Sequence, residues 1–325
     1  MATAIERPLR EFRSTVTGFM DVFICCASFE ARCLSIAEQI DPACVGAVLL
    51  AHNDGMLSGN GVKICERFGD KVKLVAFRID EPIQTADVLR QALECAISSP
   101  EATVVADITT FTHEQLLILL GLLRAGRRGK RLILAYSGAA EYMVGTEKWL
   151  SHGIREIRSV LGYPGVLLPS RNVHLVVLVG FELERAERLV EEYEPATISL
   201  GYARPADSIL ASMSETNQKF HSQLAGRLEN VHHFTFSCRD AVATRDAIVA
   251  QVAKFPGYSA VVAPMNTKVS TVGAALASSQ DPSIQLCYAE AKRYNLEGYS
   301  RPGDSFYLVD APGLWDQMAD RSSGE

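Results

Sequence analysis

The chain has 325 residues, which is enough for two domains of ordinary size that each bury a core. Hydrophobic residues make up 48% of it and charged residues 22%, a balance that excludes intrinsic disorder and fibrous proteins. The net charge of −6 argues against a surface that coats nucleic acid. The apolar runs are too short to span a membrane, and the N-terminus lacks the features of a signal peptide. We therefore expect a cytoplasmic protein that does not contact a membrane.

Apolar runs alternate with amphipathic segments along the first half of the chain. After a lead-in segment at residues 1–18, a first strand follows Asp21, and further strands are predicted at Val45–Ala51, Lys73–Ile79, Thr103–Ala106 and Arg131–Tyr136. Helical spacing between them predicts helices that end near Ile40, Phe68, Ser98 and Arg124. This alternation is typical of a doubly wound parallel sheet, in which ligands bind at the carboxyl ends of the strands.

The second half repeats the landmarks of the first half in the same order, at an offset of about 150 to 160 residues. The matched segments are 28–32 with 180–185, 45–53 with 197–203, 85–89 with 244–248, 104–110 with 261–267, and 134–142 with 286–294. We therefore predict an α/β chain of two tandem Rossmann-like units that arose by internal duplication. The predicted units span residues 19–150 and 170–312, with a linker and helix at 151–169 and a tail at 313–325.

Polar side chains gather where each half passes from its fourth strand to the next helix. They are Asp107, Thr109, Thr110 and Thr112 in the first half, and Asn266, Thr267, Lys268, Ser270 and Thr271 in the second. Helix capping explains one hydroxyl at each helix start. Several hydroxyls beside a lysine favour an anion site, because a helix N-terminus also presents free N–H groups. The second cluster, which has the lysine, is the principal predicted ligand site.

A glutamate and an arginine follow the first strand of each half. Glu30 precedes Arg32, and Glu182 precedes Arg185. The arginines suit a phosphate and the glutamates suit a ribose or a base, although an ion pair that ties strand to helix explains the same residues equally well. Tyr288 has a ring that suits stacking on a base, but a core position with the hydroxyl at the surface is the alternative.

The segments Asn266-Thr-Lys-Val-Ser-Thr and Asp107-Ile-Thr-Thr-Phe-Thr resemble the strand-four motif of CARF-type Rossmann domains. In that motif an Asn or Asp, small hydroxyl residues and often a Thr-Lys pair precede a helix. The glycines usual in the motif are absent beside Thr110 and Thr267. The resemblance implies a fold that senses cyclic or linear oligonucleotide signals in prokaryotic defence.

The expected function is that of a sensor or regulatory protein that binds a nucleotide or another phosphate-bearing small molecule. An effector protein is an expected partner, because the chain has no effector motif, and open sheet edges are compatible with a homodimer. No cofactor or metal site is predicted.

Two alternatives stay open: a nucleotide-processing enzyme, with Asp107, His113 or Glu30 as acid–base candidates, and a non-catalytic scaffold subunit. Cys25, Cys26 and Cys33 are the candidates for a reactive thiol.

Overall fold

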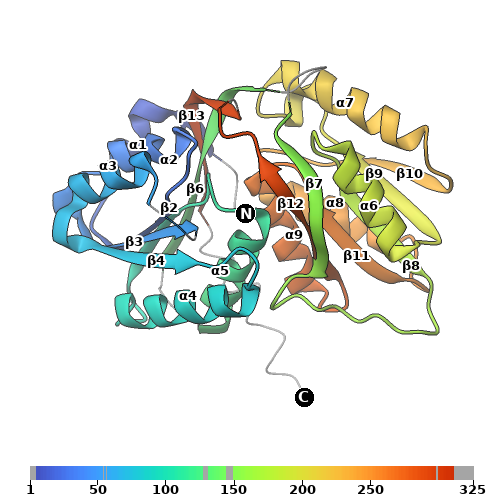
Figure 1. Ribbon diagram of the computed structural model, residues 1–325, viewed down its shortest axis with the longest axis horizontal. Helices are drawn as coiled ribbons and strands as arrows, with labels where there is room; N and C mark the ends of the chain where they lie inside the picture. Colours follow the sequence, from blue (N-terminus) through green and yellow to red (C-terminus); the bar gives the residue numbers. More distant parts are fainter. Residues whose placement is uncertain are drawn as a thin grey trace. The chain divides into compact units, whose positions relative to one another are not determined.

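The computed structural model describes residues 5–53, 55, 57–126, 131–143, 149–297 and 299–310. They form two compact units. Unit 1 contains the chain up to Tyr142 and again from Ser300, and unit 2 contains Met143–Tyr299. Each unit is a mostly parallel sheet with helices packed against it, as Figure 1 shows.

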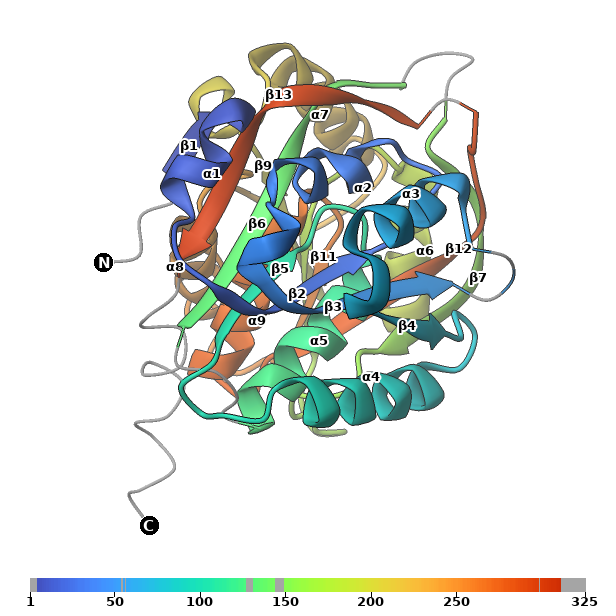
Figure 2. The same ribbon diagram turned by 90° about the vertical axis from the view of Figure 1, so that its left-hand side faces the viewer.

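Unit 1 is built on a sheet of seven described strands in the order β1-β13-β6-β5-β2-β3-β4. The strands are β1 (Ile5–Pro8), β2 (Met20–Cys26), β3 (Val45–Asn53), β4 (Val72–Phe77), β5 (Thr103–Asp107), β6 (Arg131–Tyr142) and β13 (Ser300–Asp310). Strands β2 to β6 are parallel to one another, whereas β13 runs antiparallel to β6 and β1 antiparallel to β13 (Figure 2).

Helices cover both faces of the unit 1 sheet. They are α1 (Phe12–Thr15), α2 (Arg32–Ser35), α3 (Gly59–Phe68), α4 (Pro82–Ala96) and α5 (His113–Gly126). Helices α2 and α3 lie on one side of the strands and α4 and α5 on the other (Figure 1). Phe23 and Val48 of the central strands pack with Ile36 and Phe68 into the core of the first face. Such burial on two faces explains why the parallel strands read as continuous apolar runs.

Unit 2 is built on six described strands in the order β10-β9-β8-β11-β12-β7. The strands are β7 (Ser151–Ser159), β8 (Val173–Leu178), β9 (Thr197–Tyr202), β10 (Val231–Thr235), β11 (Ser259–Pro264) and β12 (Gln285–Tyr294). The helices are α6 (Leu183–Tyr193), α7 (Ala211–Ala225), α8 (Ala241–Val252) and α9 (Lys268–Gln280). Strands β8 to β12 are parallel, and β7 runs antiparallel to β12.

The two sheets have the same strand order once the additional strand β1 is set aside. Read from one edge, β4-β3-β2-β5-β6-β13 in unit 1 corresponds to β10-β9-β8-β11-β12-β7 in unit 2. Every matched pair of segments in the sequence falls on corresponding strands or helices, or on the corresponding loops after β2 and β8. The predicted α/β fold with two Rossmann-like units is therefore confirmed, and the shared order supports the duplication.

The structure corrects the prediction at the segments that join the two halves. The linker and helix expected at 151–169 contains strand β7, which covers the edge of β12 that would otherwise leave backbone groups unpaired. Residues 300–310 were assigned to the second unit, but they pair with β6 in unit 1. The lead-in carries β1 and the fully buried Phe12, and the predicted tail at 313–325 lies outside the described residues.

The threonines that open the matched segments 85–89 and 244–248 do not cap their helices. Thr85 and Thr244 lie inside the first turns of α4 and α8, whose N-cap residues are Glu81 and Asp240. The Thr85 hydroxyl donates to the carbonyl of Arg78, and the Thr244 hydroxyl donates to that of Ser237, in both cases seven residues earlier. The matched threonines therefore fix the loop that enters each helix.

The helix expected to run through Ile40 is also shorter than predicted, because α2 ends at Ser35 and a 3-10 turn follows.

We predict that His174 makes unit 2 sensitive to acid. Its ring is fully buried, Nε2 lies 2.7 Å from the Ser199 hydroxyl, and burial, together with His232, lowers the pKa to about 4. Because the unfolded chain binds this proton at a higher pH, stability is lost as pH falls from about 6.5 to 4, by roughly 2 kcal/mol. In urea unfolding followed between pH 4 and 8, His174→Gln should flatten this slope and the exposed control His152→Gln should not. An unchanged slope in His174→Gln would contradict the assignment.

Candidate functional site

A buried arginine lies at the carboxyl edge of the unit 1 sheet. Arg32 at the start of α2 lies 2.7 Å from the Glu30 carboxylate, and its Nε donates to the Ser300 hydroxyl of β13 over 2.9 Å. Its guanidinium also lies over the ring of Tyr142, 5.3 Å from the centroid, and Tyr142 contacts Tyr136 through their hydroxyls at 3.0 Å. One cation therefore links the segment that follows β2 to β6 and to β13.

Unit 2 repeats this cluster residue for residue. Arg185 at the start of α6 pairs with Glu182 at 2.5 Å and lies 5.5 Å from the ring centroid of Tyr288. The Ser151 hydroxyl of β7 donates to Glu182, as Ser300 of β13 does to Glu30 in unit 1. The serines even share a register position, because each lies opposite the last tyrosine of its partner strand.

In the structure, the predicted glutamates and arginines therefore form ion pairs, which is the alternative to ligand binding. Burial alone would lower the pKa of Arg185, but Glu182 and the nearby tyrosines raise it above its ordinary value. Both arginines are therefore permanently charged and paired with a carboxylate, although the buried Nε of Arg185 has no hydrogen-bond partner among the described residues. In unit 2, Glu182 and Arg185 also line a pocket.

The polar cluster of unit 1 is bonded within the fold. The Asp107 carboxylate accepts from the backbone N–H of Thr109 at 3.0 Å and from its hydroxyl at 2.5 Å, and Thr109 in turn accepts from the Ser137 N–H. Thr110 donates to the Cys26 carbonyl. Thr112 and Gln115 form a reciprocal capping box at the start of α5. Helix capping, the alternative to an anion site, therefore accounts for Thr112.

The three acid–base candidates of unit 1 are placed very differently. Asp107 is 2% exposed, and burial raises its pKa to about 7 against the lowering effect of Thr109 and Arg32. Its second oxygen, Oδ2, has no hydrogen-bond partner among the described residues. His113 is half-buried as the first residue of α5, and Glu30 is engaged by Arg32. Of the candidate thiols, Cys33 has its pKa raised to about 12 by burial, so it is not a ready nucleophile.

The polar cluster of unit 2 forms the turn between β11 and α9. Thr267 is the N-cap of α9 and accepts from the Ser270 N–H at 3.2 Å. The hydroxyls of Ser270 and Thr271 donate back to the Thr267 carbonyl and are fully buried. Asn266, Thr267 and Lys268 are half-buried. The surface of this turn is therefore formed by Asn266, Thr267 and Lys268, while Ser270 and Thr271 stabilise it from inside.

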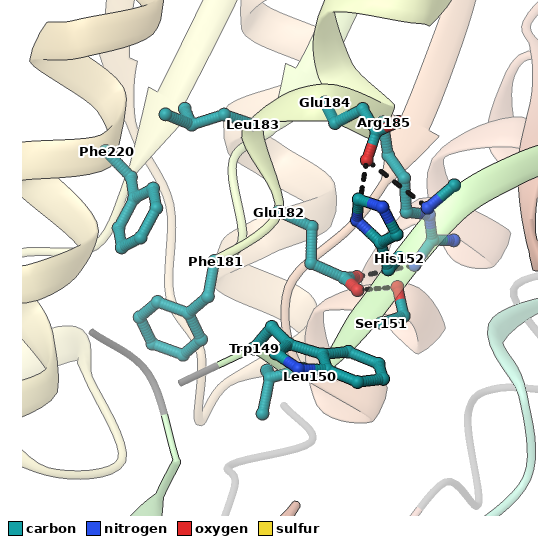
Figure 3. A pocket seen from close by; sticks show the side chains of 11 residues that line it. Trp149, Leu150, Ser151, His152, Phe181, Glu182, Leu183, Glu184, Arg185 and Phe220 are labelled. Carbon is teal, nitrogen blue, oxygen red and sulfur yellow. Dashed lines mark hydrogen bonds and ion pairs between the residues drawn. The ribbon is translucent and has the colours of Figure 1, made fainter. Parts of the chain in front are cut away.

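A pocket of about 200 Å³ opens at the same edge of unit 2 (Figure 3). The start of β7 and the residues before it form one wall, the loop from β8 into α6 another, and α7 contributes a single ring. The lining residues are Trp149, Leu150, Ser151, His152, Gly153, Phe181, Glu182, Leu183, Glu184, Arg185 and Phe220. Sequence reasoning missed Trp149, His152 and Phe220, because the first two precede or open an unpredicted strand and the third belongs to α7.

The pocket and the polar turn follow neighbouring parallel strands. Strand β8 leads to the pocket residues and β11 leads to Asn266, and the two strands pair along their whole length. The Asn266 amide donates to the Val179 carbonyl over 2.6 Å, two residues before Phe181. Gly180 makes this close approach possible, since a Cβ there would lie 1.9 Å from the Met265 carbonyl oxygen. The turn after β11 is thus packed directly on the loop that enters the pocket.

Comparison with known proteins gives a match in structure alone. No family model matches the chain, and no curated protein is significantly similar in sequence. A Type III CRISPR defence DNA nuclease activated by cyclic oligoadenylate aligns with a TM-score of 0.50 and 9% identity, over 86% of this chain and 67% of that one. The cytoplasmic domain of a prokaryotic cation chloride cotransporter aligns with a TM-score of only 0.25 and 12% identity, over 86% of this chain and 98% of that domain.

The match to the nuclease is a likeness of fold alone. Within the described part of the chain, every helix is too short or too polar to span a membrane.

Arg32 should be far more important for stability than an arginine in an exposed ion pair. Arg32→Met leaves the Glu30 carboxylate buried without its partner, at a cost of roughly 3 kcal/mol. Arg90→Met removes the exposed pair with Glu94 and should cost less than about 1 kcal/mol. In urea unfolding, adding Glu30→Gln to Arg32→Met should recover part of the loss. Equal losses in Arg32→Met and Arg90→Met would show that the cluster does not stabilise unit 1.

Asp107 should destabilise the protein progressively as pH rises. Because the folded carboxyl holds its proton up to about pH 7 and the unfolded one loses it near pH 4, stability falls between these values. Asp107→Asn cannot ionise, so the free energy of unfolding of the variant relative to the wild type should increase by about 3 kcal/mol from pH 4 to 7. A difference that stays constant with pH would contradict the raised pKa.

Proposed function

We propose that the protein is a sensor or regulatory subunit that binds a nucleotide or oligonucleotide signal at the carboxyl edge of unit 2. The observation that carries this proposal is the packing of the Asn266–Lys268 turn against the loop of the pocket. Phosphate is the group such a turn suits, since the start of α9 offers N–H groups, the positive end of a helix dipole and the Lys268 ammonium. Tyr288, by contrast, is buried and packs against Arg185 in the ion-pair cluster.

A role in prokaryotic defence is part of the proposal. It is supported by the shared fold with a nuclease that cyclic oligoadenylate activates, and by the resemblance to CARF-type domains. Because this chain has no effector motif of its own, the signal would pass to a partner protein or change the assembly of the chain, for example as a homodimer.

A nucleotide-processing enzyme is the second candidate, and Asp107 is the observation that favours it. A carboxyl with a pKa near 7 matches the need of a general base at neutral pH. The hydrogen bonds of Thr109 would have to open to expose it. Chromatography of a bound nucleotide after prolonged incubation separates the two functions, because only the enzyme yields a product.

The test of the proposed site is a thermal-shift titration with mono-, di- and cyclic nucleotides. Lys268→Ala should weaken binding by about tenfold or more, as expected for the loss of a charged contact to phosphate. Lys63→Ala removes the same charge from an exposed position on α3 of unit 1 and should leave the affinity unchanged. Equal weakening in both variants, or none in Lys268→Ala, would exclude Lys268 as a phosphate ligand. No stabilisation by any nucleotide would favour a scaffold.

A further inference from the structure

Three aromatic rings from three different segments meet at the unit 2 pocket (Figure 3). Phe181 follows β8, Phe220 lies on α7, and their ring centroids are 6.2 Å apart at an angle of 71°. Trp149 precedes β7, is 40% exposed, and lies edge-on to His152. Partly exposed rings around an opening provide flat apolar surface on which another flat group can stack.

The charges of the pocket are unsuited to a phosphate. Glu182 and Glu184 both line it, and carboxylates only accept hydrogen bonds when ionised. Arg185 donates to the Glu182 carboxylate and to the Ala289 carbonyl, which engage its two terminal nitrogens, while its Nε is buried and has no hydrogen-bond partner among the described residues. A phosphate would meet two carboxylates here, whereas a neutral group that donates hydrogen bonds would meet acceptors.

Glu184 is the carboxylate placed to receive such a donor. Its side chain is 53% exposed, and Oε2 accepts from the Gly153 N–H at 3.2 Å and lies 3.5 Å from His152 Nδ1. Because a carboxylate has about four acceptor positions, these contacts leave capacity for a ligand. Glu182, in contrast, is held by Arg185 and Ser151 within the buried cluster.

The volume of the pocket limits which part of a ligand it can enclose. Its volume of about 200 Å³ lies below the roughly 300 to 1,000 Å³ typical of pockets that enclose a whole small molecule. One heterocyclic ring fits this description better than a complete nucleotide. The remainder of the ligand would lie along the same sheet edge, where the turn after β11 begins α9 with Lys268.

We propose that this pocket binds one base of the ligand, of the kind that carries an exocyclic amino group, while the phosphates stay outside at the Lys268 turn. The ring stacks on Trp149 and Phe181 against Phe220, and the amino group donates to Glu184. This inference rests on the proposed function, since it divides one ligand between the pocket and the turn. It makes the pocket, and not the turn, the place where bases are distinguished.

Trp149 is a built-in reporter for this proposal. The chain has two tryptophans, so the Trp315→Phe protein carries Trp149 as its sole indole. In that protein, cytidine and adenosine should change the tryptophan fluorescence on titration, whereas uridine should bind about tenfold more weakly, because its 4-oxo group faces a carboxylate. Ribose 5-phosphate and choline, as probes of phosphate and of a simple cation, should leave the fluorescence unchanged.

Three variants then assign the parts of the pocket. Phe220→Leu keeps apolar volume without a ring face and should weaken cytidine binding by about tenfold, in line with measured stacking contributions. Glu184→Gln should abolish the preference for cytidine over uridine. Lys268→Ala should leave cytidine binding unchanged. A melting temperature close to that of the parent protein in each variant shows that these effects are not losses of folding.

The outcomes separate this inference from the function on which it rests. If nucleotides stabilise the protein but no nucleoside perturbs Trp149, the base pocket is overturned and the proposed function stands. Equal binding of cytidine and uridine, or a response to choline, also overturns it. If nucleosides bind as expected while Lys268→Ala leaves nucleotide affinity intact, the base pocket is supported and the phosphate assignment falls. If neither nucleotides nor nucleosides bind, both proposals fall.

Discussion

The buried Arg–Glu pairs are the interactions on which the rest of the structure depends. An ionised side chain removed from water requires a charged partner and further hydrogen bonds, and Arg32 and Arg185 obtain both from the segments they join. Arg32 ties the segment after β2 to β6, and Arg185 ties the segment after β8 to β12. In each unit the paired glutamate accepts a hydrogen bond from a serine of the antiparallel strand. Those antiparallel strands are exchanged along the chain: β7 follows β6 but pairs with β12, while β13 follows β12 but pairs with β6. Neither half of the sequence therefore contains all the strands of its own sheet.

The same pair gives unit 2 its pocket. Glu182 binds Ser151 at the start of β7, so Trp149, two residues before that serine, and His152, directly after it, lie beside the loop after β8 in the pocket lining. A structural ion pair thus positions the rings and carboxylates that would receive a ligand, which is the preorganisation that tight binding requires. The strand β11 alongside supplies the other half of the edge, with Asn266 bonded across to Val179. Unit 1 kept the ion pair, but at the position of Pro264 it has Asp107, a buried acid with a raised pKa.

Much of the fold was predictable because its signals are local. Strands β2, β3, β5, β8 and β11 are buried on both faces, so each reads as an apolar run, and the order of landmarks revealed two units. Strand β7 escaped prediction because its Ser-His-Gly-Ile-Arg-Glu start has no apolar run, and its strand state depends on pairing with β12, about 130 residues away. The candidate site was predictable only in part. The polar side chains from Asn266 to Thr271 are visible in the sequence. The sequence does not show that the hydroxyls of Ser270 and Thr271 donate to a backbone carbonyl, because this depends on the geometry of the turn. Trp149 and Phe220 reach the pocket through tertiary structure alone.

The central claim is that unit 2 holds a nucleotide with its base in the aromatic pocket and its phosphate at the start of α9. A crystal structure of the protein with a bound cyclic or linear oligonucleotide tests it most directly. The account predicts density for a base against Trp149 and Phe181, within hydrogen-bond distance of Glu184, and for a phosphate beside Lys268 and the N–H groups of the α9 N-terminus. A ligand bound elsewhere, for example at Asp107 and Thr109 of unit 1, with the unit 2 pocket filled only by water, would contradict it.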